Sequence, residues 1–433
     1  MTSWPAEAIA GTVLLVVLVF AVVRPKDLPE AVPAVPGALL LCLVGAISWT
    51  EAWSQVTRML PTVLFLAGVL MLASLCRAEG MFDAAGRLMA RGSRDSPVRL
   101  LGLVFLVAST TTALLSLDAT IVLLTPVIFT TAAKVGARPK PFIYGTAHLS
   151  NSASLLLPVS NLTNLLALSA AGISFPRFAA LMVGPWLVAI GVEYVAHRRY
   201  FATELSVSSG SVPAGRGSSQ GSGDDAGTAV PVFSLVVLGL TLAGFVVLSV
   251  LGAEPFWAAL AGVAVIGAKR LIRGRTSRSA ELKDLGAAAN PFFLLFVLSL
   301  SIIVAAVVDH GVAAAMRAVI PGGQSLASLL ILALIAAVLA NLVNNLPAVL
   351  VMLPLVAPIG PVAVLAVLIG VNVGPNLTYV GSLATLLWRR IVAAHDHRTD
   401  TGEFTRLGLI TVPACLVLCT MALSAAASLM GVS

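Results

Sequence analysis

The chain has 433 residues, of which 58% are hydrophobic and only 10% are charged. Soluble globular domains carry about 25% charged residues, so this composition excludes a water-soluble enzyme or binding module and predicts an all-α polytopic membrane protein. The net charge of +7 would suggest nucleic acid in a soluble protein. Here the basic residues flank apolar runs, where they set the orientation of a membrane protein, and no nucleic-acid partner is expected.

Six apolar runs, most of them long enough to cross about 30 Å of hydrocarbon, occupy the first part of the chain. They cover residues 8–23, 33–49, 59–76, 99–133, 140–170 and 175–196. The leader before the first run has no Lys or Arg. We therefore expect this run to be an uncleaved span rather than a signal peptide.

A Ser- and Gly-rich stretch, residues 204–230, follows and predicts a flexible cytoplasmic linker. Six more runs come after it, at residues 231–252, 255–269, 290–309, 325–357, 361–392 and 405–430. The two sets match in order and approximate length, which indicates an internal repeat. We expect a first repeat over residues 1–203 and a second over residues 231–433.

The fourth run of each set, residues 99–133 and 325–357, is too long for one comfortable span and short for two spans with a turn. The middle of each run is polar, with Asp118 in the first and Asn344 and Asn345 in the second. A polar turn at membrane depth is tolerated only where it is buried in protein or lines a cavity. Both runs therefore predict re-entrant hairpins, which enter and leave the membrane on the same side.

The fifth runs predict long helices interrupted by polar backbone. The first reads HLSNSASLLLPVSNLTNLL (148–166) and the second reads NVGPNLTYVGSLATLL (372–387). Pro158 and the pair Gly374-Pro375 are helix breakers. Each run predicts two half-helices joined by an unwound stretch at the membrane midplane.

The distribution of basic residues predicts the topology. If each half contributes five crossings and one hairpin, the second half is inverted relative to the first. With both termini outside, all 26 Lys and Arg residues lie on the cytoplasmic side except Arg58, Arg177 and Arg317, as the positive-inside rule requires. We expect ten transmembrane helices plus two re-entrant hairpins in the cell inner membrane, the first hairpin opening to the cytoplasm and the second to the outside.

Inverted repeats with broken helices are the architecture of secondary transporters, whose substrate sites lie where the breaks meet. The triplet Asn161-Leu-Thr163 recurs as Asn376-Leu-Thr378, and the two copies are expected at the same place in each half. The polar side chains at this centre are mainly uncharged, which suits a small, neutral, hydroxylated solute. The alternative role for each Asn is to cap a broken helix. The candidate substrate-binding residues are Asn151, Asn161, Thr163, Asn344, Asn345, Asn376 and Thr378.

Asp118 is the one acid expected deep in a membrane segment, whereas Glu193 lies near the end of one. A buried ionisable group is costly and functional by default, and burial favours a protonated carboxyl group. Asp118 is therefore a candidate proton carrier, with an N-cap of the following half-helix as the alternative. His148, the one histidine expected well inside a membrane segment, either takes part in proton coupling or packs as a hydrogen-bonded core residue.

The one match to an enzymatic motif, Gly-x-Ser-x-Gly at residues 217–221, lies in the Ser- and Gly-rich linker and is attributed to chance. The sequence has no P-loop, no His-Glu-x-x-His and no Cys-x-x-Cys, so we expect no enzyme, no cofactor and no bound metal. The four cysteines lie in or beside apolar runs and are expected to be packing residues rather than disulfides.

Four stretches of the sequence resemble the ArsB-type arsenite and antimonite efflux permeases of the ion transporter superfamily. They are SLDATIVLLTPVI (116–128), NSASLLLPVSNLTNLL (151–166), NLVNNLPAVLV (341–351) and GPNLTYVGSLATLLWRR (374–390). The resemblance implies proton-coupled antiport on a two-hairpin inverted-repeat fold, and arsenical resistance as the biological role. It also implies, for some members, a soluble arsenite-stimulated ATPase as partner, and a homodimer is a further expectation.

Arsenite and antimonite are neutral trihydroxides at ordinary pH, which agrees with an uncharged site. The alternative is a sodium-coupled carboxylate transporter or a sodium/proton transporter of the same superfamily. Relatives that carry dicarboxylates have Ser-Asn-Thr at both hairpin tips. This chain has Ser-Leu-Asp-Ala-Thr and Asn-Leu-Val-Asn-Asn-Leu-Pro there, which favours arsenite export.

Overall fold

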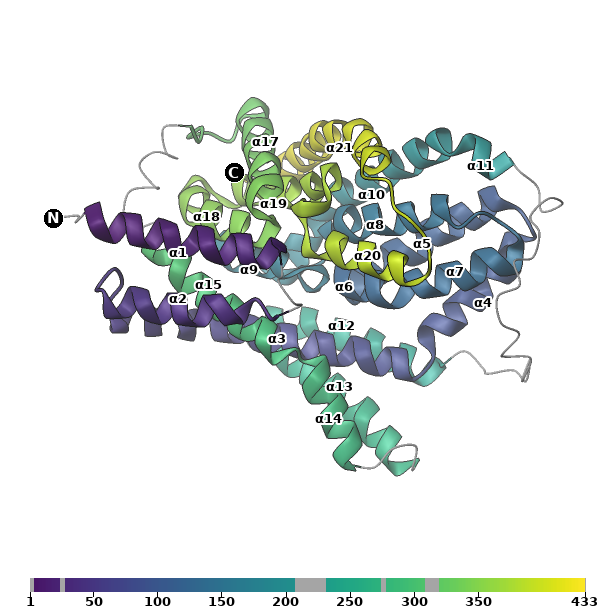
Figure 1. Cartoon of the computed structure of the whole chain (residues 1–433), viewed down its shortest axis with the longest axis horizontal. Helices are drawn as coiled ribbons and strands as arrows, with labels where there is room; N and C mark the ends of the chain where they lie inside the picture. Colours follow the sequence, from purple (N-terminus) through teal and green to yellow (C-terminus); the bar gives the residue numbers. More distant parts are fainter. Residues whose placement is uncertain (1–3, 24–27, 207–230, 274–277, 308–318, 433) are drawn as a thin grey trace.

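The computed structural model describes the chain except for residues 1–3, 24–27, 207–230, 274–277, 308–318 and 433. Most of the predicted linker, residues 207–230, and the external Arg317 therefore lie outside the described residues. The described residues form helices and turns, without a strand among them (Figure 1).

The helices of the first half are α1 (Trp4–Val23), α2 (Ala31–Leu43), α3 (Trp49–Ala78), α4 (Met81–Ser93), α5 (Pro97–Leu114), α6 (Leu117–Ala119), η2 (Thr120–Leu124), α7 (Thr125–Val135), α8 (Lys140–Ser152), η3 (Ala153–Leu155), η4 (Pro158–Ser160), α9 (Leu162–Ala171), α10 (Phe175–Tyr200) and α11 (Ala202–Ser206). Those of the second half are α12 (Val232–Val250), α13 (Phe256–Ile272), α14 (Arg278–Ala288), α15 (Pro291–Val307), α17 (Leu326–Val343), α18 (Asn345–Val356), η6 (Ala357–Ile359), α19 (Pro361–Val373), η7 (Gly374–Leu377), η8 (Tyr379–Gly381), α20 (Leu383–Ala394) and α21 (Thr401–Leu429).

Eight helical stretches among the described residues are long and apolar enough to cross a membrane. They are α3, α5, residues 117–135, α10, α12, residues 279–307, α17 and α21. Shorter apolar helices, including α9, α18 and α19, accompany them. The chain is thus an all-helical, multi-pass membrane protein, as its composition predicts. Both arms of the run 99–133 are among the eight, and the division into ten spans and two hairpins stays a prediction.

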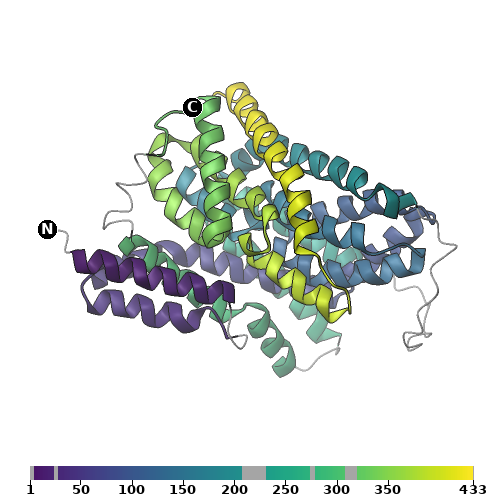
Figure 2. The ribbon, with the colours of Figure 1, turned by 45° about the horizontal axis from the view of Figure 1, so that its top comes forward.

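The helices form two groups, and each group draws on both halves of the chain (Figures 1 and 2). In the peripheral group, α1, α2 and α3 pack with α12, α13 and α15. In the central group, α5 and α8–α10 pack with α17–α21. The two halves are therefore interleaved rather than separate domains.

Several helices begin at residues whose side chains bond the first free backbone N–H groups. Ser48 forms a capping box with Glu51 at the start of α3. Ser96 caps α5, Ser325 caps α17 and Asp400 caps α21. These caps satisfy donors that lipid could not satisfy.

Two long helices of the central group are interrupted in the same way. In the first, α8 ends at Ser152, the turns η3 and η4 follow, and α9 begins after the extended residue Asn161. In the second, α19 ends at Val373, the turns η7 and η8 follow, and α20 begins after the extended residue Ser382. The sequence prediction of two broken helices is therefore confirmed.

The predicted equivalence of the two Asn-Leu-Thr triplets is wrong. Asn161 is the N-cap of α9, and its side chain accepts a hydrogen bond from the Thr163 N–H at 3.3 Å. The same task in the second broken helix falls to Ser382, which accepts from the Ala384 N–H at 3.2 Å. Asn376 lies earlier, inside the turn η7. Asn and Ser serve equally well as N-caps, so an identical triplet in the two halves does not identify structurally equivalent positions.

Candidate functional site

A small cavity of about 50 Å³ lies where the broken helices meet the middle of the two predicted hairpins. Leu66 of α3 and Phe293 of α15 close it on the side of the peripheral group. The polar residues that line it are Ser116, Asp118, Ser160, Asn161, Thr163, Asn345 and Ser382. We call this cavity the central pocket.

Four helical segments begin at the wall of the central pocket. Their first residues are Leu117, Leu162, Asn345 and Leu383, of which all four line the cavity. A helix N-terminus carries free N–H groups and a partial positive charge. Among the described residues no Lys, Arg or His lines this pocket, and Asp118 is its one ionisable group. The pocket therefore offers hydrogen bonds and a weak positive potential without a fixed cation.

A buried network ties α9 to the end of α19 directly behind the central pocket. Asn372 Oδ1 accepts hydrogen bonds from Asn161 Nδ2 at 3.1 Å and from Thr163 Oγ1 at 2.7 Å. Asn372 Nδ2 donates to Asn164 Oδ1 at 2.7 Å, and Asn164 Nδ2 donates in turn to the carbonyl groups of Ser154 and Leu157. Asn161 and Thr163 thus line the pocket and also hold the broken helices together.

A second network joins the end of α8 to the second break. Asn151 Nδ2 donates to Asn376 Oδ1 at 3.0 Å and to Thr385 Oγ1 at 3.2 Å. Asn376 Nδ2 donates to the His148 carbonyl at 3.1 Å and to Glu193 Oε1 at 2.9 Å. Asn151 and Asn376 are fully buried and are absent from the lining of the central pocket. Their side chains join the two broken helices to each other and do not face the central pocket.

The remaining candidate residues lie around the start of α18. Asn345 lines the central pocket, and Asn344 adopts a left-handed φ of 76° while its Nδ2 donates to the Val380 carbonyl at 3.2 Å. Thr378 Oγ1 donates to Asn341 Oδ1 at 2.8 Å, and Asn341 Nδ2 bonds the Gly374 carbonyl. Asn344 and Thr378 therefore hold the second break against α17 and α18.

Asp118 stands between the central pocket and a larger cavity of about 500 Å³. Ser116 and Asp118 line both spaces. The larger cavity, which we call the wide cavity, is bounded further out by Arg77, Arg270 and residues of α14. The Ser116 side chain accepts from the Ala119 N–H at 3.1 Å, so Ser116 and not Asp118 caps this helix.

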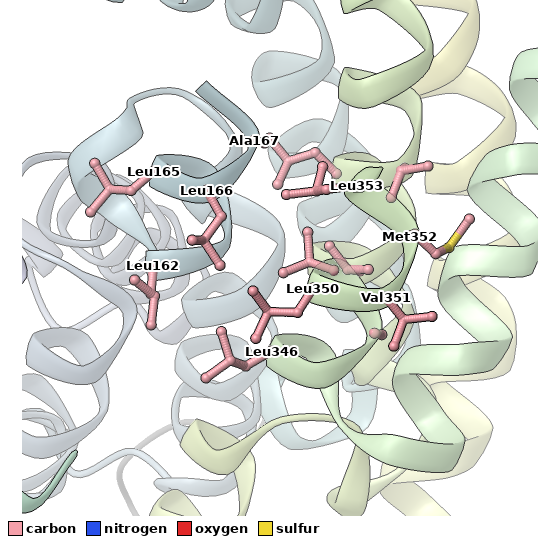
Figure 3. Packing of buried hydrophobic residues seen from close by; sticks show 14 of the residues in the cluster. Leu162, Leu165, Leu166, Ala167, Leu346, Leu350, Val351, Met352 and Leu353 are labelled. Carbon is pink, nitrogen blue, oxygen red and sulfur yellow. The ribbon is translucent and has the colours of Figure 1, made fainter. Parts of the chain in front are cut away.

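A third cavity of about 430 Å³ lies at the other end of α3, beside Arg58. We call it the far cavity. Between it and the central pocket α9 packs against α18 through leucine side chains (Figure 3). Leu162 and Leu346 line the central pocket, whereas Leu166 and Leu350 line the far cavity. This leucine layer separates the two spaces, while the central pocket shares its Asp118 wall with the wide cavity.

Two ionisable residues of the interior were not predicted. Glu193 and His197 of α10 are 0% exposed, although the sequence places them near the end of an apolar run. His148 Nδ1 lies 3.1 Å from Glu193 Oε2, and His197 Nδ1 lies 2.8 Å from the Glu193 carbonyl oxygen. The spacing of Glu193 and His197, one helical turn apart, was the available signal for a shared buried face.

The described residues hold one group with the spacing of a metal site, because ligand atoms of His148, Glu193 and His197 lie within 4.8 Å of one another. The carboxylate already accepts hydrogen bonds from Asn376 and has His148 beside it. We assign no metal to this group. The four cysteines are free and buried, as predicted.

Known proteins resemble this chain over most of its length. Residues 15–375 match the family model CitMHS, described as citrate transporter. The chain is 25% identical to an arsenical pump membrane protein of Escherichia coli (strain K12) over 94% of this chain and 96% of that protein. It is 24% identical to the uncharacterized transporter Mb2703 of Mycobacterium bovis over 82% and 83% of the two chains.

Among solved structures, the crystal structure of the Alcanivorax borkumensis YdaH transporter is similar to this chain, with a TM-score of 0.62 and coverage of 88% of both chains. At 16% sequence identity this likeness concerns the fold alone. The predicted resemblance to arsenical pump membrane proteins is confirmed. The chain belongs to the CitMHS family and is a multi-pass secondary transporter rather than an enzyme.

Proposed function

We propose that this transporter exports arsenite and antimonite in exchange for protons, by alternating access of the central pocket. The observation that carries the proposal is the chemistry of the pocket wall. It presents hydroxyl and amide groups and four helix N-termini, with Asp118 as its one ionisable side chain among the described residues. Such a wall can bond the oxygens of a neutral trihydroxide without burying a net charge.

A carboxylate substrate, as the family description suggests, is the second candidate. Helix N-termini attract anions, which is the observation in its favour. A tricarboxylate would bring several charges into a pocket whose described lining has no cation and one acid. It would also need more room than about 50 Å³. We therefore favour the small neutral solute.

Our proposal includes two inverted repeats, residues 1–203 and 231–433, joined by the linker 204–230. Three observations support it: the two helix breaks have the same order of elements, α5 and α17 both have 18 residues, and helices of the two halves interleave. The hairpins would be residues 99–133 and 325–357, with ten further spans. The bias of Lys and Arg supports external termini.

In this topology the wide cavity, beside Arg77 and Arg270, faces the cytoplasm. Arsenite would enter through it and pass Asp118 into the central pocket. The leucine layer would then open as the wide cavity closes, and substrate would leave through the far cavity. Asp118 would take up a proton from outside and release it inside, with His148 assisting proton coupling.

The deciding experiment uses a bacterial strain that lacks its own arsenite exporter. Expression of this chain should lower arsenite accumulation and raise resistance, and everted vesicles should accumulate arsenite when an imposed pH gradient makes their interior acidic. Asp118→Asn should abolish gradient-driven accumulation at equal expression. Citrate uptake that depends on sodium, without arsenite movement, would contradict the proposal.

Two partners follow from the same proposal. A soluble ATPase would supply energy beyond the proton gradient, and a second copy of the chain would form a homodimer. Purified protein in liposomes without ATP tests the first, because gradient-driven accumulation there shows that the ATPase is dispensable. Mass measurement in detergent tests the second.

A further inference from the structure

We propose that Glu193, together with His148 and His197, forms a second proton-binding site of the transport cycle, whose protonation state is transmitted to the broken helices through Asn376. This inference rests on proton-coupled transport as proposed above. It concerns a cluster that lies apart from the central pocket, since none of the three residues lines that pocket.

The cluster of Glu193, His148 and His197 is buried and carries a net charge unless it binds a proton. All three side chains are 0% exposed, within a helix pair that crosses the apolar interior. With Glu193 ionised and both histidines neutral, the cluster carries one uncompensated negative charge, which is expensive at this depth. One added proton makes the cluster neutral, whether it resides on the carboxylate or on an imidazole. The cluster is therefore built to hold one proton.

Each histidine of the cluster has a ring nitrogen that can accept this proton. A carbonyl oxygen accepts hydrogen bonds only, so His197 Nδ1, 2.8 Å from the Glu193 carbonyl, carries its hydrogen. Neutral His197 then has its lone pair on Nε2. His148 Nε2 is buried without a hydrogen-bond partner among the described residues, and His197 has a second backbone partner in Tyr144. The two rings are 5.0 Å apart between centroids, at an angle of 82°.

The described residues around the cluster supply no cation other than the two histidines to balance the charge of Glu193. The ion pairs of Glu193 within the described residues are those with His148 of α8 and His197 of its own helix. From α21 the cluster meets the Cys415 thiol, which lies within reach of the charge of Glu193, and the ring of Phe404. From α5 it meets the ring of Phe105, and from α8 it also meets Tyr144. No Lys or Arg in the described residues forms an ion pair with it.

Hydrogen bonds through Asn376 connect Glu193 to both broken helices. Asn376 Nδ2 donates to Glu193 Oε1 at 2.9 Å, and Asn376 Oδ1 accepts from Asn151 at 3.0 Å. A hydrogen bond to a carboxylate is roughly twice as strong as one to a neutral acceptor. A proton on Glu193 therefore weakens its hold on the turn η7, and a proton on His148 weakens that hold too because the imidazolium competes with Asn376 for the same carboxylate. The proton state is thereby felt at the contact between the two broken helices.

A divalent metal would fit the spacing of the cluster but not its charge. A doubly charged cation with one carboxylate and two neutral imidazoles leaves a net positive charge in the same apolar surroundings. A proton leaves none. The cluster also already uses its carboxylate oxygens for Asn376 and His148.

Liposomes that contain the full-length protein test the inference through Glu193→Gln, which keeps the shape, the acceptor for Asn376 and, with His148 in its other tautomer, the bond to His148, but holds no proton. We expect arsenite exchange at equal pH to stay within about twofold of wild type, while accumulation driven by a pH gradient falls about tenfold or more, a loss of about 1.4 kcal/mol of coupling. Glu254→Gln, at an exposed acid outside the cluster, should change neither activity. Unchanged gradient-driven accumulation in Glu193→Gln would overturn the inference.

A measurement without substrate separates this inference from the proposed function. Infrared difference spectra of purified protein after a pH jump should show carboxyl and imidazole bands that wild type and Asp118→Asn share and Glu193→Gln lacks. Bands that persist in Glu193→Gln would overturn the inference even if arsenite transport is confirmed. Zinc bound in a one-to-one ratio, and lost in Glu193→Gln, would overturn it as well. Wild type that shows these bands but moves no arsenite would contradict the proposed function alone.

Discussion

Asn151 donates a hydrogen bond from Nδ2 to Oδ1 of Asn376 at 3.0 Å, across 225 residues of sequence. The contact joins the end of α8 to the turn η7, so the two broken helices are bonded to each other at their breaks. A matching contact exists in the other direction, where Asn372 at the end of α19 bonds Asn164 of α9. The breaks are thus mutually braced, and a change in one break must be accommodated by the other.

Replacing Asn372 by Ala should destabilise the protein more than removing an ordinary polar side chain. The change removes one buried hydrogen bond each from Asn161 Nδ2, Thr163 Oγ1 and Asn164 Oδ1, and each buried polar group left unsatisfied costs about 1–3 kcal/mol. We expect a clear fall in the thermal unfolding temperature in detergent. Ser428→Ala, whose hydroxyl bonds its own helix near an exposed end, should leave that temperature within about a degree. An equal effect of both changes would contradict the bracing role of Asn372.

Gly408→Ala should impair folding and transport because α21 packs directly on the second break. A Cβ atom at Gly408 would meet the carbonyl oxygen of Asn376, which is backbone and cannot rotate away. Gly191→Ala on the neighbouring helix α10 is the matched control, since a Cβ there meets nothing within 4 Å. It should be neutral or stabilise the helix by up to about 1 kcal/mol. Yield and unfolding temperature of both variants measure the difference, and a well-folded, active Gly408→Ala would show that η7 can move away from α21.

Much of this architecture could be predicted from local chemistry. Pro158 and Gly374-Pro375 interrupt helices wherever they occur, so the two breaks were visible in the sequence. Asn161, Thr163 and Asn345 were predicted as candidates because polar residues within an apolar run are uncommon, and all three line the central pocket. Asp118 was found for the same reason, and it does line the pocket.

The errors arose where position depends on packing rather than on composition. Glu193 lies seven residues before the end of α10 at Tyr200, yet basic residues nearby made it look like the edge of a span. Its contacts come from α8 and η7, and the one-turn spacing of Glu193 and His197 indicates a shared helix face but not which elements cover that face. Asn372 was missed because it stands alone in an apolar helix, and its partners lie more than 200 residues away.

The order of the three cavities along α3 predicts a pattern of chemical labelling. Ser74 lines the wide cavity, Ser160 the central pocket and Ser169 the far cavity. In a background without the four native cysteines, a cysteine at position 74 should react with a membrane-impermeant maleimide from the cytoplasmic side. A cysteine at position 169 should react from the outside.

Labelling of a cysteine at position 160 shows from which side of the membrane the central pocket can be reached. It should react slowly and from the cytoplasmic side alone, because the leucine layer blocks the other route (Figure 3). Replacing Leu350 by Ala should open a route from the outside and raise the rate there. Labelling of position 74 from the outside would show that the proposed orientation is inverted.

Glu79→Gln should destabilise the end of α3 strongly, because it leaves the largely buried Lys269 without its carboxylate partner and removes one of the two carboxylates beside Arg270. Glu79 bonds Lys269 at 2.7 Å and lies 3.5 Å from Arg270, with the Glu79 side chain 4% exposed. Arg270 also pairs with Glu281 of α14 at 2.7 Å, so the network ties α3, α13 and α14 together beside the wide cavity. Removing one partner of a buried ion pair typically costs about 3–5 kcal/mol.

The matched control for this network is Lys140→Gln, which breaks the pair with Glu403 where the lysine is 40% exposed. An exposed pair contributes about 0–1 kcal/mol, and its small effect should shrink further at high salt. The unfolding temperature of each variant, measured at low and high salt, distinguishes the two cases. If Glu79→Gln loses no more stability than Lys140→Gln, water reaches the ion pairs of Glu79 in the membrane-embedded protein. These pairs then do not hold α14 in place, and α14 is free to move away from the wide cavity during transport.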